Sequence, residues 1–213
     1  MQKDGHNHTF DLSGGALCLD FANTWSDRER PDTDHLQEYS DLLAFARQTG
    51  ALSGAAEGRL AGHAAGDPQA AAAAVEVARG LREDLYRIFS AVAASQAPAE
   101  PDLERLNAAL PGAFSRLRLQ SQKDDLVWTW SAPDDPLEAP LWPVLRSAAE
   151  LLTAEERKLV RECAGTACTW LFLDHSRNRS RRWCSMETCG NRAKAQRHYR
   201  RRSETGQDGE PPV

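Results

Sequence analysis

The stretch CAGTACTWLFLDHSRNRSRRWCSMETCGNRAKAQRHYRRR, residues 163–202, decides how this chain is organised. It contains four of the five cysteines, as two C-x4-C pairs separated by fifteen residues. Clustered cysteines in a reduced compartment are typical of a metal site rather than of disulfides. Zinc is favoured because it accepts four thiolates tetrahedrally, and an iron–sulfur cluster is the alternative. The expected ligands are Cys163, Cys168, Cys184 and Cys189.

The residues around these cysteines predict a small finger. The apolar run 170–173 predicts a strand, the polar residues 174–180 a turn and residues 181–184 a returning strand. Residues 192–202 are mostly helix formers. The order of knuckle, hairpin, second cysteine pair and helix predicts a treble-clef-like zinc finger. So short a segment buries little apolar surface, so one structural zinc ion is expected to supply its folding free energy.

Charge divides the chain in the same place. Residues 157–202 hold 13 basic and 3 acidic side chains, a net charge of +10. Residues 1–156 hold 13 and 25, a net charge of −12, so the total of −5 conceals a strongly basic segment. Such a segment favours an anionic partner such as DNA, and a solvated face without a ligand is the alternative.

The predicted C-terminal helix presents cations on two of its faces, and the face with Ala195 and Tyr199 is expected to pack on the finger hairpin. Arginine and lysine contact phosphates, and arginine or glutamine can make bidentate contacts to bases. The candidate DNA-binding residues are Arg177, Arg179, Arg181, Arg182, Arg192, Lys194, Gln196, Arg197, Arg200 and Arg201.

The preceding 155 residues predict a mainly α body with a small β-hairpin, which makes the chain α+β. Apolar spacing predicts helices over 34–49, 69–92, 102–110 and 140–152. Alternation on either side of a polar turn predicts strands at 116–120 and 126–130. The apolar run within 12–25 fits a buried strand or a buried helix, because its periodicity does not separate the two.

Three polar residues in the apolar part of the body are candidate ligand contacts. Asp20, Asn23 and Arg82 either line a small-molecule pocket, where an arginine fork would hold a carboxylate, or form a buried structural network. The fifth cysteine, Cys18, lies in an apolar run and is expected to be a small buried filler.

Several classes of protein are disfavoured. The sequence has no run of about 18 apolar residues, and its start lacks the layout of a secretory signal, so we expect a cytoplasmic protein without a membrane partner. It also lacks a glycine-rich phosphate loop, a nucleophile elbow and an open-site zinc motif. We therefore expect a protein that is not an enzyme.

The C-terminal stretch resembles the CGNR zinc finger, which is named for the residues that here are Cys189, Gly190, Asn191 and Arg192. The cysteine spacing, the LFLD strand, the RRWC return and the start of the last helix all agree with this family. The resemblance implies a DNA-binding element of bacterial transcription regulators. It also implies zinc ligation by the four cysteines and places Asn191 and Arg192 at the helix start, where Asn191 can serve as a cap.

The body resembles the ABATE domain, which usually precedes such a finger. The resemblance rests on LCLDFANT, residues 17–24, and on LRE, residues 81–83. It implies a ligand-sensing region at 1–155, followed by the finger at 156–202. The composition of the tail at 203–213 predicts disorder. We expect a transcription regulator that binds DNA, senses a small-molecule effector and can form a homodimer. The alternatives are a zinc-stabilised protein-interaction module and a sequence-nonspecific nucleic-acid-binding module.

Overall fold

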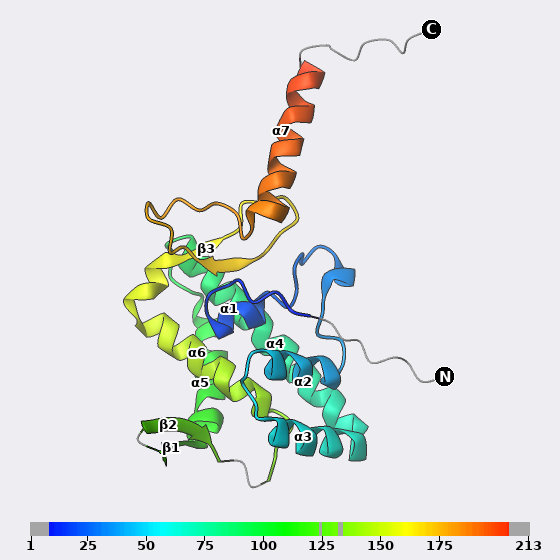
Figure 1. The fold of residues 1–213 in the computed structure, drawn as a ribbon, viewed down its shortest axis with the longest axis vertical. Helices are drawn as coiled ribbons and strands as arrows, with labels where there is room; N and C mark the ends of the chain where they lie inside the picture. The colour runs from blue at the N-terminus through cyan, green and yellow to red at the C-terminus, as the bar shows by residue number, and fades with distance from the viewer. Residues whose placement is uncertain (1–8, 124, 132–133, 205–213) are drawn as a thin grey trace, which may run out of the picture.

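The computed structural model describes residues 9–123, 125–131 and 134–204 (Figure 1). For residues 198 and 201–204 it describes the backbone alone. The predicted disordered tail lies outside the described residues from position 205 onward.

The body is a bundle of helices around one long helix, α4 (Figure 1). α4 spans Pro68–Ala93, begins with Pro68 in its first turn and is capped by Asp67, whose carboxylate accepts the Ala70 N–H at 2.9 Å. Its buried residues recur every three or four positions from Ala71 to Phe89, so one face enters the core. The other body helices are α1 (Leu17–Ala22), α2 (Tyr39–Gln48), α3 (Gly54–Gly66), α5 (Glu100–Phe114) and α6 (Trp142–Thr153). Short 3-10 turns join them at Pro31–Thr33, Ala139–Leu141 and Glu155–Leu159.

The predicted fold class is confirmed, and most predicted body elements are present. The helices expected at 34–49, 69–92, 102–110 and 140–152 correspond to α2, α4, α5 and α6. The predicted hairpin is β1 (Leu117–Gln122) with β2 (Asp125–Trp130), paired antiparallel from Leu117 opposite Trp130 to Gln122 opposite Asp125. The apolar run that left strand and helix open is the short helix α1, which packs against α4 and α6.

The finger strand is confirmed, but its predicted partner is wrong. Strand β4 (Leu171–Leu173) pairs antiparallel with β3 (Val160–Glu162), which precedes the first cysteine, and residues 181–184 form no strand. Instead, the Ala164 N–H donates to the Arg182 carbonyl oxygen at 2.8 Å, which holds the returning segment beside the first cysteine loop. β3 is the better partner because Val160 is buried together with Leu171 and Leu173 in the body core.

β4 is shared by two cores. Leu171 and Leu173 belong to the large core of the body, whereas Phe172 between them belongs to a small core with three of the clustered cysteines. This division follows from strand geometry, because successive side chains point to opposite faces. The finger is therefore attached to the body by a strand whose side chains are buried in both hydrophobic cores.

Hydrogen bonds from the N-terminal part of the body to the backbone of β4 fix this strand in place. The Asn23 side chain accepts the Leu171 N–H and donates to the Leu171 carbonyl oxygen, both at 2.8 Å. The Leu173 N–H donates to the Gly14 carbonyl oxygen at 2.8 Å. Gly15, which follows, has φ +86°, and a Cβ there would lie 3.3 Å from Leu173, so the turn and the close approach both require glycine.

The last helix, α7 (Asn191–Glu204), extends away from the body (Figure 1). It continues directly from a short π-helical turn, Met186–Gly190, whose first N–H groups are capped by the Ser185 hydroxyl. The predicted cap at Asn191 is therefore wrong, because Asn191 already lies inside the continuous helix. The predicted packing of Ala195 and Tyr199 on a hairpin is also wrong, since both are exposed and Tyr199 is 71% exposed. Within the described residues, no helix has the length and apolar character needed to span a membrane.

Replacing Asn23 with alanine is expected to lower the free energy of unfolding by about 2–4 kcal/mol, because it leaves the Leu171 N–H and C=O buried without partners. Chemical denaturation measures the change. The exposed Asn178→Ala serves as the control and should stay within about 0.5 kcal/mol of the wild type. Equal stability of the two variants would contradict the anchoring role of Asn23.

Candidate metal centre and nucleic-acid interface

The four predicted ligands lie together. The Sγ atoms of Cys163, Cys168, Cys184 and Cys189 all lie within 4.8 Å of one another, and the four cysteines are buried or half-buried. The Sγ of Cys184 lies 3.8 Å from that of Cys168 and 3.7 Å from that of Cys189. These separations are far too long for disulfides. A tetrahedral zinc ion with Zn–S bonds of about 2.3 Å places its sulfurs about 3.8 Å apart, so the cluster fits zinc.

The backbone around the cluster is shaped for thiolates. The N–H groups of Gly165 and Cys184 each donate to the Cys163 Sγ at 3.4 Å, which is the orientation that stabilises a negatively charged sulfur. A Cβ at Gly165 would lie only 3.1 Å from the Cys189 Sγ, so the chain can pass the sulfurs here because this residue is glycine. Ala167, with φ +57°, completes the tight turn of the first cysteine pair.

Four thiols at this distance do not ionise independently. Hydrogen bonds from Cys168 and Cys184 lower the pKa of the Cys163 thiol, and the same contact with Cys163 raises the pKa of Cys168. The contacts with Cys163 and Cys168 also raise the pKa of Cys184. One thiolate therefore opposes the next, and only a cation at the centre stabilises them all. With four cysteines filling a tetrahedron, no position stays open for substrate, which is the arrangement of a structural site.

Two predicted DNA contacts from the returning segment differ in what they touch. The Arg181 guanidinium lies 4.4 Å from the centre of the Phe172 ring and donates to the carbonyl oxygens of Trp183 and Cys184. These contacts favour a bracing role for Arg181. Arg182 is exposed and lies over the Trp183 ring at 5.5 Å.

The remaining predicted contacts are exposed wherever their side chains are described. Arg177 and Arg179 lie in the loop after β4, and the others lie on α7, which places all of them at one end of the molecule (Figure 1). Side chains from α7 and from the returning segment surround a hollow of 260 Å³, whose polar lining consists of Arg182, Gln196, Arg197 and Arg200. The other exposed members are Arg177, Arg179, Arg192 and Lys194. Arg201 lies on α7, and its side chain is outside the described ones.

A half-buried arginine that the sequence did not single out joins the body to the finger. Arg28 forms an ion pair with Glu83 at 2.9 Å and donates to the Thr169 hydroxyl at 2.7 Å, next to Cys168. Its guanidinium also lies 3.5 Å from the centre of the Tyr86 ring. The Tyr86 hydroxyl in turn donates to the Glu162 carboxylate at 2.7 Å. The only hint in the sequence was Glu83 in the LRE segment, and its partner is 55 residues away.

The three candidate ligand contacts all bind groups of the chain itself. Asp20 accepts the Gly14 N–H at 2.8 Å, and Asn23 is engaged with Leu171 as described above. Arg82 is 1% exposed and pairs with both oxygens of Asp34, at 2.5 and 2.8 Å. They lie near one another around α1 and α4, and their contacts favour the buried structural network over the ligand pocket.

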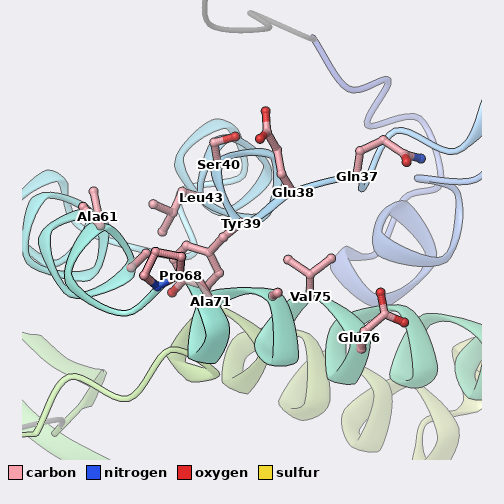
Figure 2. Close-up of a pocket in the computed structure, with 13 residues that line it drawn as sticks. Gln37, Glu38, Tyr39, Ser40, Leu43, Ala61, Pro68, Ala71, Val75 and Glu76 are labelled. Carbon is pink, nitrogen blue, oxygen red and sulfur yellow. The ribbon is translucent and has the colours of Figure 1, made fainter.

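The body contains cavities elsewhere. One of 440 Å³ lies between α2, α3 and α4, and Figure 2 shows Leu43, Pro68 and Val75 around it, with Glu38 pointing away from α4 at its rim. Its lining is mainly alanine and other apolar side chains. Neither Asp20, Asn23 nor Arg82 is among the described residues that line it.

The cysteine cluster predicts one zinc ion per chain. Cys189→Ser is expected to lose stoichiometric zinc, as measured by a colorimetric metal assay. A chelator is expected to lower the melting temperature of the wild type, because β4 belongs to both the finger core and the body core. Cys18→Ala is the control, since Cys18 is buried in the body core away from the quartet and should keep its zinc. Zinc retained by Cys189→Ser, or lost by Cys18→Ala, would contradict the assignment.

Asp20 predicts a pH dependence of stability. Burial raises the pKa of its carboxyl to about 6, against a usual value of 3.8, so the folded state disfavours the ionised form. The free energy of unfolding should therefore fall as pH rises from about 4 to about 6, and the cost persists above that range. Asp20→Asn should remove this trend and be more stable than the wild type at pH 7 by up to about 3 kcal/mol.

The difference between Asp20→Asn and the wild type is the quantity to measure, by denaturation at several pH values. The exposed Asp125→Asn provides the matched control. A difference that does not change with pH would show that Asp20 is not the titrating group.

Comparison with known proteins agrees with this architecture. Residues 15–155 match the family ABATE, which is described as "putative stress-induced transcription regulator". Residues 160–202 match the CGNR zinc finger. No curated protein matches the chain. The ABATE match covers well over half of the sequence and contains α1 and α4, whereas the zinc-finger match contains all four clustered cysteines. The chain therefore belongs to the ABATE family and carries a CGNR zinc finger.

Proposed function

We propose that this protein is a bacterial transcription regulator that binds DNA through its zinc finger and senses a small molecule through its body. The observation that carries the DNA-binding part is a difference in how the two regions use their cations. In the body they are neutralised by neighbouring carboxylates. In the finger, a set of exposed cations within the described residues is not.

Ten of the eleven arginines between residues 28 and 146 lie in ion pairs. Arg87 and Arg105, for example, share the carboxylates of Asp84 and Asp102 between α4 and α5. These cations are therefore committed to the structure and offer little to an anionic partner.

A set of exposed finger cations has no such partners. Among the described residues, no carboxylate lies within ion-pair distance of a set of six exposed side chains, namely Arg177, Arg179, Arg182, Arg192, Lys194 and Arg197. Like charges gathered on one surface repel one another, and phosphates relieve this repulsion with release of counterions. This uncompensated charge supports DNA as the partner.

The shape of the finger supports the same partner. α7 has 14 residues, which is about 21 Å of helix, and it extends from the body with its sides exposed. An α-helix fits the major groove of B-DNA, where Gln196 and the arginines would meet base edges and phosphates. Zinc, when bound by the four cysteines, would hold the start of α7 against the first cysteine loop.

As part of this proposal, the protein senses a small molecule, is not an enzyme and resides in the cytoplasm. We also expect a homodimer, because two fingers on two half-sites would gain both affinity and sequence selectivity. The exposed apolar side chains of the β1–β2 hairpin, Leu119, Leu126 and Trp128, are the surface that we expect a second copy to cover.

The test is a titration of the zinc-loaded protein with fragments of its own upstream DNA at several salt concentrations. With five to seven phosphate contacts, the slope of log affinity against log salt should be about −4.5 to −6. The double variant Arg192→Ala/Arg197→Ala should make the slope shallower by about 2 units. Arg47→Ala, which removes an exposed body arginine paired with Glu57, should leave it unchanged.

The alternatives give different results in the same experiment. Zinc-dependent binding that prefers one fragment supports the regulator, whereas salt-sensitive binding without preference indicates a sequence-nonspecific nucleic-acid binder. No binding, or a slope near −1, would contradict DNA binding and leave the protein-interaction module.

A further inference from the structure

A second cavity of the body lies where the finger is attached, and its volume is 680 Å³. It opens between the end of α4, the start of α5, the end of α6 and the connection from α6 into β3. This size falls within the range of about 300–1,000 Å³ typical of sites for drug-sized ligands. Its apolar lining consists of Val92, Ala93, Pro98, Leu103 and Leu152.

The polar part of the lining consists of three cations, Arg157, Lys158 and Arg161, with Ser95 and Gln96. Lys158 is paired with Glu155 at 2.5 Å. The guanidinium of Arg157 donates to the Ala154 carbonyl oxygen, and that of Arg161 donates to carbonyl oxygens of its own segment. Within the part of the chain that is described, neither arginine has a carboxylate at ion-pair distance, although both are half-buried.

We propose that this cavity binds an organic anion with an apolar body and a carboxylate head. The apolar part of the lining would remove the hydrocarbon of a ligand from water. Asp174 and Glu155 act on Arg161 and Arg157 only from beyond ion-pair distance, so each half-buried guanidinium would gain from a direct, bidentate contact with a carboxylate. The two features adjoin, so they select a molecule that carries both. This effector site lies apart from Asp20, Asn23 and Arg82.

The cavity between α2, α3 and α4 lacks this chemistry. The charged residues in its lining, Glu38 and Glu76, are both acidic. Glu38 is the N-cap residue of α2, and Glu76 is paired with Arg79 at 2.7 Å. It thus offers apolar surface without a cation for a ligand head group.

The position of the cavity links it to the finger. Arg161 lies in β3 directly opposite Phe172 of β4, two residues before Cys163. α4 lines the cavity with Val92 and Ala93, and one turn earlier its Ser90 hydroxyl donates to the Glu162 carboxylate at 2.6 Å. An anion bound by Arg161 would therefore shift the position of the β3–β4 strand pair, to which the first cysteine loop is attached. This regulatory step rests on the proposed function, whereas binding of the anion does not.

The binding step is tested by calorimetry on the full-length, zinc-loaded protein with three probes. Octanoate has both the chain and the charge, octan-1-ol has the chain, and acetate has the charge. Octanoate should bind at least about 10-fold more tightly than either of the others, because one charge-assisted contact contributes about that factor. Octan-1-ol or acetate binding as tightly as octanoate would overturn the proposal, as would no binding of octanoate.

Variants locate the site. In Arg157→Gln/Arg161→Gln, each glutamine can still donate to a carbonyl oxygen but carries no charge, and octanoate should bind at least about 10-fold more weakly. Arg146→Gln, on α6 outside the cavity lining and paired with Glu150, is the control and should bind octanoate as the wild type does. Equal affinity in the double variant and the wild type would overturn the assignment.

The regulatory step has its own readout. Octanoate should change the affinity of the wild type for its DNA by about 5-fold or more and leave that of the double variant unchanged. If octanoate binds as expected but no DNA does, the site stands and the proposed function falls. If the double variant loses DNA affinity in the absence of octanoate, these arginines are phosphate contacts, and the regulatory step is overturned.

Discussion

The alternation of side chains along one three-residue strand holds the molecule together. Leu171 and Leu173 enter the body core, and Phe172 enters the cysteine cluster, where Arg181 covers its ring. Other parts of the chain hold this strand in place. Asn23 and Gly14 form hydrogen bonds with its backbone, β3 pairs with its edge, and Arg28 binds Thr169 in the loop that precedes it. The position of the cysteines, and hence of α7, depends on these contacts.

The two regions are stabilised by different means, and this difference gives them different surfaces. The body buries a large apolar core and uses its arginines in ion pairs, so its cations are neutralised locally and its exterior keeps an excess of acidic groups. The finger has a small core of one phenylalanine and cysteines, so it depends on a metal. Because the metal replaces a larger core, the exterior of the finger can be covered with uncompensated arginine.

The sequence predicted the cysteine quartet, the basic surface and the main body helices, because spacing and periodicity are local properties. It did not predict the partner of β4, since residues 160–162 and 181–184 are both short, and pairing was decided by Val160 entering a core built from distant residues. Helix α3 was missed because it consists mainly of glycine and alanine and Leu60 is its one buried residue, so its sequence shows little periodicity of apolar side chains. The ligand assignment of Asn23 and Arg82 rested on residue type, whereas their partners, Leu171 and Asp34, depend on the tertiary fold.

The shared strand also bears on what a domain means in this family. The two family matches meet between residues 155 and 160, so the sequence divides there into two units of inheritance. The physical boundary is different, since the interior of the first unit is completed by Val160, Leu171 and Leu173 from the second. Removing the second unit would therefore take three apolar side chains out of the core of the first, so the joint between the two units is part of the core and not a linker.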